Sequence, residues 1–250
     1  RLCGRPVCRP SRGGMVGLAS GRLAVDLDGD GTVLCGRLDF VFPDCQDFKF
    51  SREDCMTTVN AEVMLQDTQR WLERAVIGLN LCPFAKAVVV HDRLRVRVSN
   101  AREPALLLQE LQEELERLVA SPIEQVETTL LVAPWICPDF LDFNDLVGEA
   151  HDVLEGLALE GELQIADFHP RYQFAGTLEQ DPGNLTNRAP YPILHLLREE
   201  SIDRAVASTP DAATIYERNI ALLERLGQAG WEQLGIRTRC PFHHAPEDES

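Results

Sequence analysis

Stretches with helical periodicity alternate with short apolar runs between residues 64 and 226, and this alternation restricts the fold more than any other feature. Apolar positions from Met64 to Leu79 recur at about 3.6-residue spacing, which predicts a helix that ends near Asn80. The same spacing predicts helices over residues 103–119 and 138–161. Helices that alternate with strands in this way are typical of a sheet covered by helices.

The segments between these helices predict the strands. Residues 87–90, followed by alternation at Leu94, Val96 and Val98, predict a hairpin, and residues 127–134 and 162–168 predict two further strands. Residues 191–206 and 212–226 predict two more helices, the first of them begun by Pro190 and Pro192. The predicted fold is therefore α/β (or α+β), with a small mixed sheet of about four strands that opens with a hairpin and is covered by about five helices.

Residues 1–55 differ from the rest of the chain. They show no sustained periodicity, and they hold five of the eight cysteines, at positions 3, 8, 35, 45 and 55. We expect residues 1–55 to be a disordered extension, a leader or a gene-start artefact. Residues 56–235 then form a single globular domain, and residues 236–250 form a frayed acidic tail.

The net charge of −16 limits the partners. Residues 1–55 are balanced, so the globular part carries the whole excess of acidic groups, and such a body repels nucleic-acid phosphates and anionic lipid. No apolar run approaches the roughly 20 residues of a membrane span. We predict no nucleic acid and no membrane as partners. Few cysteines in the globular part favour reduced thiols and a cytoplasmic location, or an organellar one if residues 1–55 are a leader.

Several long phrases resemble a known family. They are "RWLERAVIGLNLCPFAKA", "TTLLVAP", "FLDFNDLVGEA", "ELQIADFHPRYQFAGT" and "NLTNRAPYPILHLLREESIDRAV", within a match that covers roughly residues 60–231. Together they resemble the domain-of-unknown-function 1415 family, an uncharacterised and mainly bacterial group. The resemblance implies no activity, so it assigns no catalytic roles and no cofactor, and the cofactor remains unknown.

Cys82 is the first candidate for chemistry, because it lies directly before Pro83 at the end of a predicted helix. As the N-cap of the turn "PFAK", with Lys86 nearby, its thiolate would be stabilised, whereas the end of the preceding helix would oppose this. The alternative is a small buried plug without reactivity.

His169 is the second candidate, because "FHPRYQFAG" follows a predicted strand and ligands gather beyond the carboxyl ends of strands. His169 would act as a general base, while Tyr172 would assist catalysis and Gln173 would supply a ligand contact. Alternatively, His169 only forms hydrogen bonds within its loop, and the Tyr172 ring only contributes packing.

A third candidate is an anion site. Asn187 and Arg188 precede the helix predicted from Pro190, and His195 and Arg198 would share one face of it. The alternative is ion pairing with neighbouring acids.

The sequence evidence for a metal site is weaker than that for these three candidates. Asp142, Asp145 and Glu149 could hold Mg²⁺ but are more typical of a wet helix face. A calcium-loop-like start at Asp26 has Arg37 where a glutamate is required, and "CPFHH" has no second ligand pair. We therefore predict no metal ligands.

These candidates lead to three hypotheses. The first is an enzyme, a transferase or hydrolase, that acts on a small anionic metabolite at a Cys82/His169/Arg188 pocket. The second is a non-catalytic anion-binding or regulatory module that uses the same pocket. The third is an acidic scaffold that meets a basic partner. The sequence leaves the oligomeric state open.

Overall fold

The computed structural model describes residues 52–208 and 214–236. The predictions for most of the N-terminal extension, for the calcium-like loop, for "CPFHH" and for the acidic tail from residue 237 lie outside the described residues.

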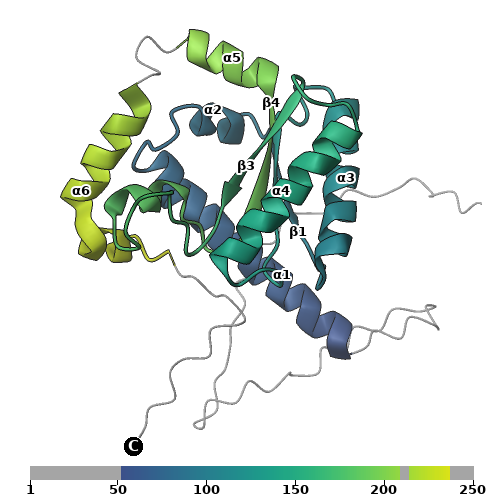
Figure 1. Cartoon of the computed structure of the whole chain (residues 1–250), viewed down its shortest axis with the longest axis horizontal. Coiled ribbons are helices and arrows are strands. Elements are labelled where there is room, and N and C mark those ends of the chain that lie inside the picture. Colours follow the sequence, from purple (N-terminus) through teal and green to yellow (C-terminus); the bar gives the residue numbers. More distant parts are fainter. Residues whose placement is uncertain (1–51, 209–213, 237–250) are drawn as a thin grey trace, which may run out of the picture. The chain divides into compact units, whose positions relative to one another are not determined.

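A four-stranded mixed sheet lies at the centre of the described part (Figure 1). It contains β1 (Leu94–Val98), β2 (Thr128–Val132), β3 (Leu163–Phe168) and β4 (Ile193–Arg198), in the order β1-β2-β4-β3. Strand β1 runs parallel to β2, and β4 runs antiparallel to both β2 and β3. Strands β1, β2 and β3 therefore all finish at the same end of the sheet, here called the carboxyl end. The predicted α/β fold with a mixed sheet is confirmed.

Helices cover both faces of this sheet. Alternate strand residues point to opposite sides, and apolar strand residues occur on both sides, so each face needs a covering layer. Helices α3 (Pro104–Ala120) and α4 (Phe140–Gly156) pack on one face, where Leu131 and Leu194 are fully buried. Helix α1 (Arg52–Trp71), its π-helical continuation η1 (Leu72–Ile77), the 3-10 helix η2 (Pro182–Asn187) and α6 (Ile215–Gln233) pack on the other, against Leu130 and Ile193.

The helix predicted over residues 191–206 is wrong in its first half. Residues 193–198 form β4, and a helix, α5 (Glu199–Ala207), follows only from Glu199. Strand β4 lies between β2 and β3 and is buried on both faces, so its apolar residues run consecutively instead of alternating. Pro190 and Pro192 therefore precede a strand and begin no helix.

The predicted opening hairpin is also wrong. Residues 85–90 form a short helix, α2 (Ala85–Val90), which ends before the left-handed Asp92, and β1 pairs with β2 rather than with these residues. The β-branched run Val88–Val90 favours a strand locally, yet no residue of α2 is buried.

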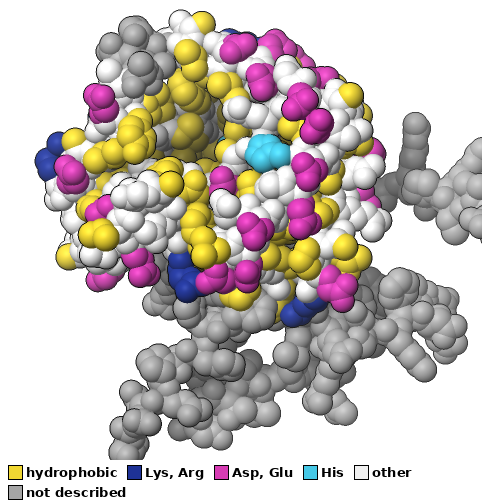
Figure 2. Space-filling model, viewed as in Figure 1, with side chains coloured by type: hydrophobic (Ala, Val, Ile, Leu, Met, Phe, Trp, Pro, Cys, Tyr) yellow, Lys and Arg dark blue, Asp and Glu magenta, His cyan; other side chains and the backbone are white. Residues whose placement is uncertain are grey.

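Helices α2, α5 and α6 leave large apolar side chains exposed, namely those of Val89, Val90, Val206 and Tyr216. The space-filling view shows an apolar hollow (yellow) in the region that these three helices surround (Figure 2). None of the described helices combines the length and the apolar character that crossing a bilayer requires.

Candidate functional site

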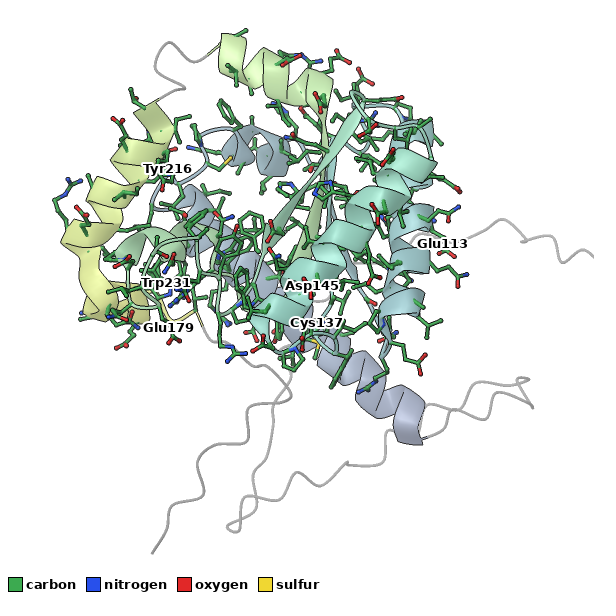
Figure 3. The ribbon with its side chains drawn as sticks, in the orientation of Figure 1. Glu113, Cys137, Asp145, Glu179, Tyr216 and Trp231 are labelled. Atoms are coloured by element: carbon green, nitrogen blue, oxygen red, sulfur yellow. The ribbon has the colours of Figure 1, made fainter. Side chains whose placement is uncertain are left out.

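A pocket of about 460 Å³ lies at the carboxyl end of the sheet, here called the carboxyl-end pocket. The loop after β1 contributes Arg102, the start of α3 contributes Pro104, and the loop after β2 contributes residues 135–138. Helix α4 supplies Asp142, Asp145, Leu146 and Glu149, and Figure 3 shows Asp145 on α4 close to Cys137. Sites beyond the carboxyl ends of strands are common in open sheets with crossover helices.

An arginine stacked on a tryptophan lines this pocket. The Cζ atom of Arg102 lies 3.9 Å from the centroid of the Trp135 ring, which is a cation–π contact. Trp135 is half-buried and Arg102 is exposed. Within the described residues, Arg102 has no carboxylate partner, so its charge faces the pocket unpaired.

Three carboxylates of α4 line the same pocket. Asp139 caps α4 by accepting a hydrogen bond from the Leu141 N–H, and Phe143 and Leu146 anchor the helix in the core. Asp142, Asp145 and Glu149 are left on its exposed side, and Figure 2 shows acidic side chains (magenta) over α4. In the described part of the chain, none of the three carboxylates makes a hydrogen bond or an ion pair.

Cys137 lies at the pocket with a left-handed backbone, at φ 50°. Burial raises the pKa of its thiol to about 11, with further contributions from Asp142 and Glu149, so the thiol stays protonated near neutral pH. A thiol in this state is a poor nucleophile. Among the described residues, no group of three or more His, Cys, Asp or Glu side chains is placed to hold a metal ion.

His169, the predicted general base, follows β3 and is buried beside this pocket, with 1% of its surface exposed. Its Nδ1 accepts a hydrogen bond from the Arg171 N–H at 3.1 Å, which leaves the proton on Nε2, and Nε2 donates to the Cys137 carbonyl at 3.1 Å. The ring also contacts Phe140 and Phe143, with centroids 5.5 and 5.2 Å away. Burial, above all, lowers the pKa of His169 to about 4. The neutral ring thus connects the loop after β3 to the loop after β2.

The structure brings His169 together with Tyr172, Asn187 and Arg188. The His169 N–H donates to the Asn187 carbonyl, and Nε of Arg188 donates to the Tyr172 carbonyl at 3.2 Å. Nη2 of Arg188 donates to the Glu179 carbonyl at 2.6 Å. Burial raises the pKa of Tyr172 and lowers that of Arg188. The Arg188 guanidinium, which the sequence predicts to bind an anion, therefore donates hydrogen bonds to backbone carbonyls.

Comparison with known proteins identifies the family of this chain. A family model described as "Protein of unknown function (DUF1415)" matches residues 63–233, which is more than half of the chain and includes every lining residue of the pocket. The chain belongs to the DUF1415 family. No curated protein and no solved structure matches it.

In this DUF1415 protein, the arginines of the predicted anion site lie apart. Arg188 precedes β4, whereas Arg198 ends it, so the two lie at opposite ends of the sheet. Nη2 of Arg198 donates to the carbonyl of Leu118, in the last turn of α3, and to that of Ser121, which follows the helix. The shared helical face expected for His195 and Arg198 is wrong, because both residues belong to a strand.

His195 points toward the face of the sheet that α1 and α6 cover. The Thr128 hydroxyl donates to the Leu196 carbonyl at 2.6 Å, so Nε2 of His195 donates to the Thr128 oxygen at 2.8 Å. Burial lowers the pKa of His195 to about 4. Like His169, it is a neutral histidine with a bonded ring.

Cys82 and Lys86 belong to a different part of this DUF1415 fold. The N–H of Cys82 donates to the Val76 carbonyl, and Phe84, not Cys82, is the N-cap of α2. Asn219 of α6 holds this turn by donating to the Leu81 carbonyl at 2.7 Å. Within the described residues, no hydrogen bond or ion pair joins Cys82 or Lys86 to His169 or Arg188. Gln173 donates to the Thr177 carbonyl inside its own loop.

Sequence reasoning missed Arg102, Trp135 and Cys137. The loop "PWICPD" follows a buried strand, as "HPRYQ" does, so the strand-end argument that selected His169 applies equally to it. What the sequence lacked was the direction of the strands, which places the ends of β1, β2 and β3 together.

Proposed function

We propose that this protein binds a small metabolite with a positively charged amine in the carboxyl-end pocket. The observation that carries the proposal is a pocket of about 460 Å³ in which three carboxylates without partners among the described residues accompany an aromatic ring. A volume of this size lies in the range of small-molecule sites. Carboxylates and aromatic faces both attract an ammonium group.

Two observations favour this amine site over the anion site expected from sequence. The guanidinium groups of Arg188 and Arg198 donate to backbone carbonyls, and both ring nitrogens of His169 are bonded to backbone groups. These groups are thus already engaged within the fold, whereas the three carboxylates that line the carboxyl-end pocket have no partner among the described residues. The enzyme acting on an anionic metabolite and the acidic scaffold stay predictions.

A thermal-shift screen of the full chain tests the proposal, with amines, carboxylates and phosphates compared at equal ionic strength. A ligand at a hundred times its dissociation constant adds about 2.7 kcal/mol to the free energy of unfolding. We expect amines to raise the melting temperature and Asp145→Asn to remove that increase.

Asp152→Asn is the matched control, because Asp152 is an exposed acid of α4 that does not line the pocket. The proposal fails if no amine stabilises the protein, or if Asp145→Asn and Asp152→Asn reduce the stabilisation equally.

A further inference from the structure

The pocket has charges of both signs, and we infer from this that its ligand is a zwitterion of the amino-acid class, with an ammonium and a carboxylate on one small molecule. This inference rests on the proposed function and adds to it the second charged group of the ligand. Its basis is Arg102, which has no carboxylate partner in the part of the chain that the structure describes, in a pocket whose other charged lining groups are carboxylates.

The cationic part of the pocket is Arg102, in the loop after β1, which lines the pocket beside Pro104, the first residue of α3. The start of α3 adds little to this positive charge, because Pro104 has no N–H, the N–H groups of Leu106 and Leu107 donate to the Glu103 carbonyl, and Glu103 is itself acidic. A ligand carboxylate would therefore be held by the Arg102 guanidinium, whose geometry allows two parallel hydrogen bonds to it.

The anionic part comes from α4. With a rise of about 1.5 Å per residue, Asp142 and Asp145 are separated by about 4.5 Å along the axis, and Glu149 lies about 6 Å further on. These carboxylates line the pocket over about two turns of the helix, so they offer an ammonium group several partners.

Trp135 adds an aromatic surface to the same pocket. Its ring contacts the Arg102 guanidinium, and it lines the pocket together with Ile136 and Leu146. These apolar surfaces suit the carbon skeleton of an amino acid or a short peptide. A ligand with only positive charges would meet Arg102, and one with only negative charges would meet three carboxylates, so each is disfavoured by repulsion.

Titration calorimetry on the full chain tests the inference with matched probes. The probes are the twenty standard amino acids and, for each, the amine that lacks the carboxylate and the acid that lacks the ammonium. For the side chain that binds most tightly, we expect the amino acid to bind at least tenfold more tightly than either partial analogue.

Arg102→Gln separates the two charge contacts. We expect it to weaken binding of the amino acid at least tenfold and to strengthen binding of the matching amine, because it removes a repelling positive charge, whereas Asp145→Asn weakens both. Arg97→Gln is the control, since Arg97 is an arginine of β1 outside this pocket. Neither Arg102 nor Arg97 is buried, so both variants should fold.

The outcomes distinguish the two proposals. If the amine binds as tightly as the amino acid, and Arg102→Gln weakens the binding of neither, the zwitterion inference is overturned and the amine site stands. If neither amines nor amino acids bind, both are overturned. Tightest binding by the acids, with no effect of Asp145→Asn, would also overturn both.

Discussion

The ring of His169 is buried, contacts two phenylalanines of α4 and is hydrogen-bonded at both nitrogens. One of those bonds goes to the carbonyl of Cys137, a lining residue of the carboxyl-end pocket. The position of His169 at a strand end could be predicted from sequence. Its bond to Cys137 could not, because that partner comes from a loop 32 residues away.

His169→Ala should lower the free energy of unfolding by about 3 kcal/mol or more. It leaves the Cys137 carbonyl and the Arg171 N–H without partners, and it opens a cavity between the two rings. Urea unfolding measures this loss. His151→Ala is the control, because His151 is exposed on α4 and should change stability by no more than about 0.5 kcal/mol. Equal effects of the two variants would refute the structural role of His169.

The lowered pKa values of His169 and His195 also predict how stability depends on pH. Their folded pKa values of about 4 lie below the ordinary value of 6.5, so the unfolded chain binds these protons more readily. The free energy of unfolding should therefore fall as pH decreases from about 6.5 toward about 4, by up to about 1.4 kcal/mol per pH unit for each histidine.

Urea unfolding at pH 7, 6 and 5 measures this dependence, and a variant with His169→Gln and His195→Gln should show a flatter profile over the same interval. Equal stability of the native sequence at pH 5 and pH 7 would show that the rings are not held neutral.

At the scale of elements, long amphipathic segments could be predicted and short apolar ones could not. Helices α3 and α4 were predicted because their buried residues recur every three or four positions. Strand β4 and helix α2 were assigned wrongly, since a strand buried on both faces and a six-residue helix rich in valine both lack a distinguishing period. For such segments the packing around them decides the structure.

Gly78 follows the π-helical segment and should not tolerate a side chain. A Cβ atom there would lie 2.4 Å from the Arg74 carbonyl oxygen, so Gly78→Ala requires the backbone to shift, and we expect a loss of about 1–3 kcal/mol. Gly148→Ala is the matched control, because a Cβ on this α4 glycine meets nothing within 4 Å. That change should stabilise the protein by up to about 1 kcal/mol.

Thermal or urea unfolding of both variants provides the measurement. If the Gly78→Ala variant is as stable as the Gly148→Ala variant, the close approach of the Arg74 carbonyl to Gly78 is contradicted.

Arg198 connects β4 to the end of α3, and its loss should weaken that connection. Arg198→Ala leaves the carbonyls of Leu118 and Ser121 without their donor, so we expect a loss of about 2–3 kcal/mol in urea unfolding. Arg204→Ala should lose less than about 0.5 kcal/mol, because the Arg204 side chain forms an exposed ion pair with Glu200 on α5. A comparable loss in both would contradict a structural role for Arg198.

For the whole molecule, the site depends on strand direction and order. The loops after β1 and β2 form the carboxyl-end pocket because these two strands are parallel neighbours, and β3 ends at the same place although it lies at the far edge. Local patterns identify strands but contain no information about their order, so the sequence located His169 and missed Arg102 and Trp135. The same topology separates Arg198 from Arg188 and so disperses the predicted anion site.

The tryptophan indole resonances measure occupation of the pocket most directly. The chain has three tryptophans, of which Trp135 alone lines the pocket, while Trp71 donates its indole N–H to the Arg188 carbonyl in the core. In nitrogen–proton correlation spectra recorded with the twenty amino acids and their amines, we expect the Trp135 indole signal to move saturably with at least one probe. The indole signals of Trp71 and Trp231 should not move. A Trp135 signal that no probe moves, or that moves only together with both others, would contradict the carboxyl-end pocket as the binding site.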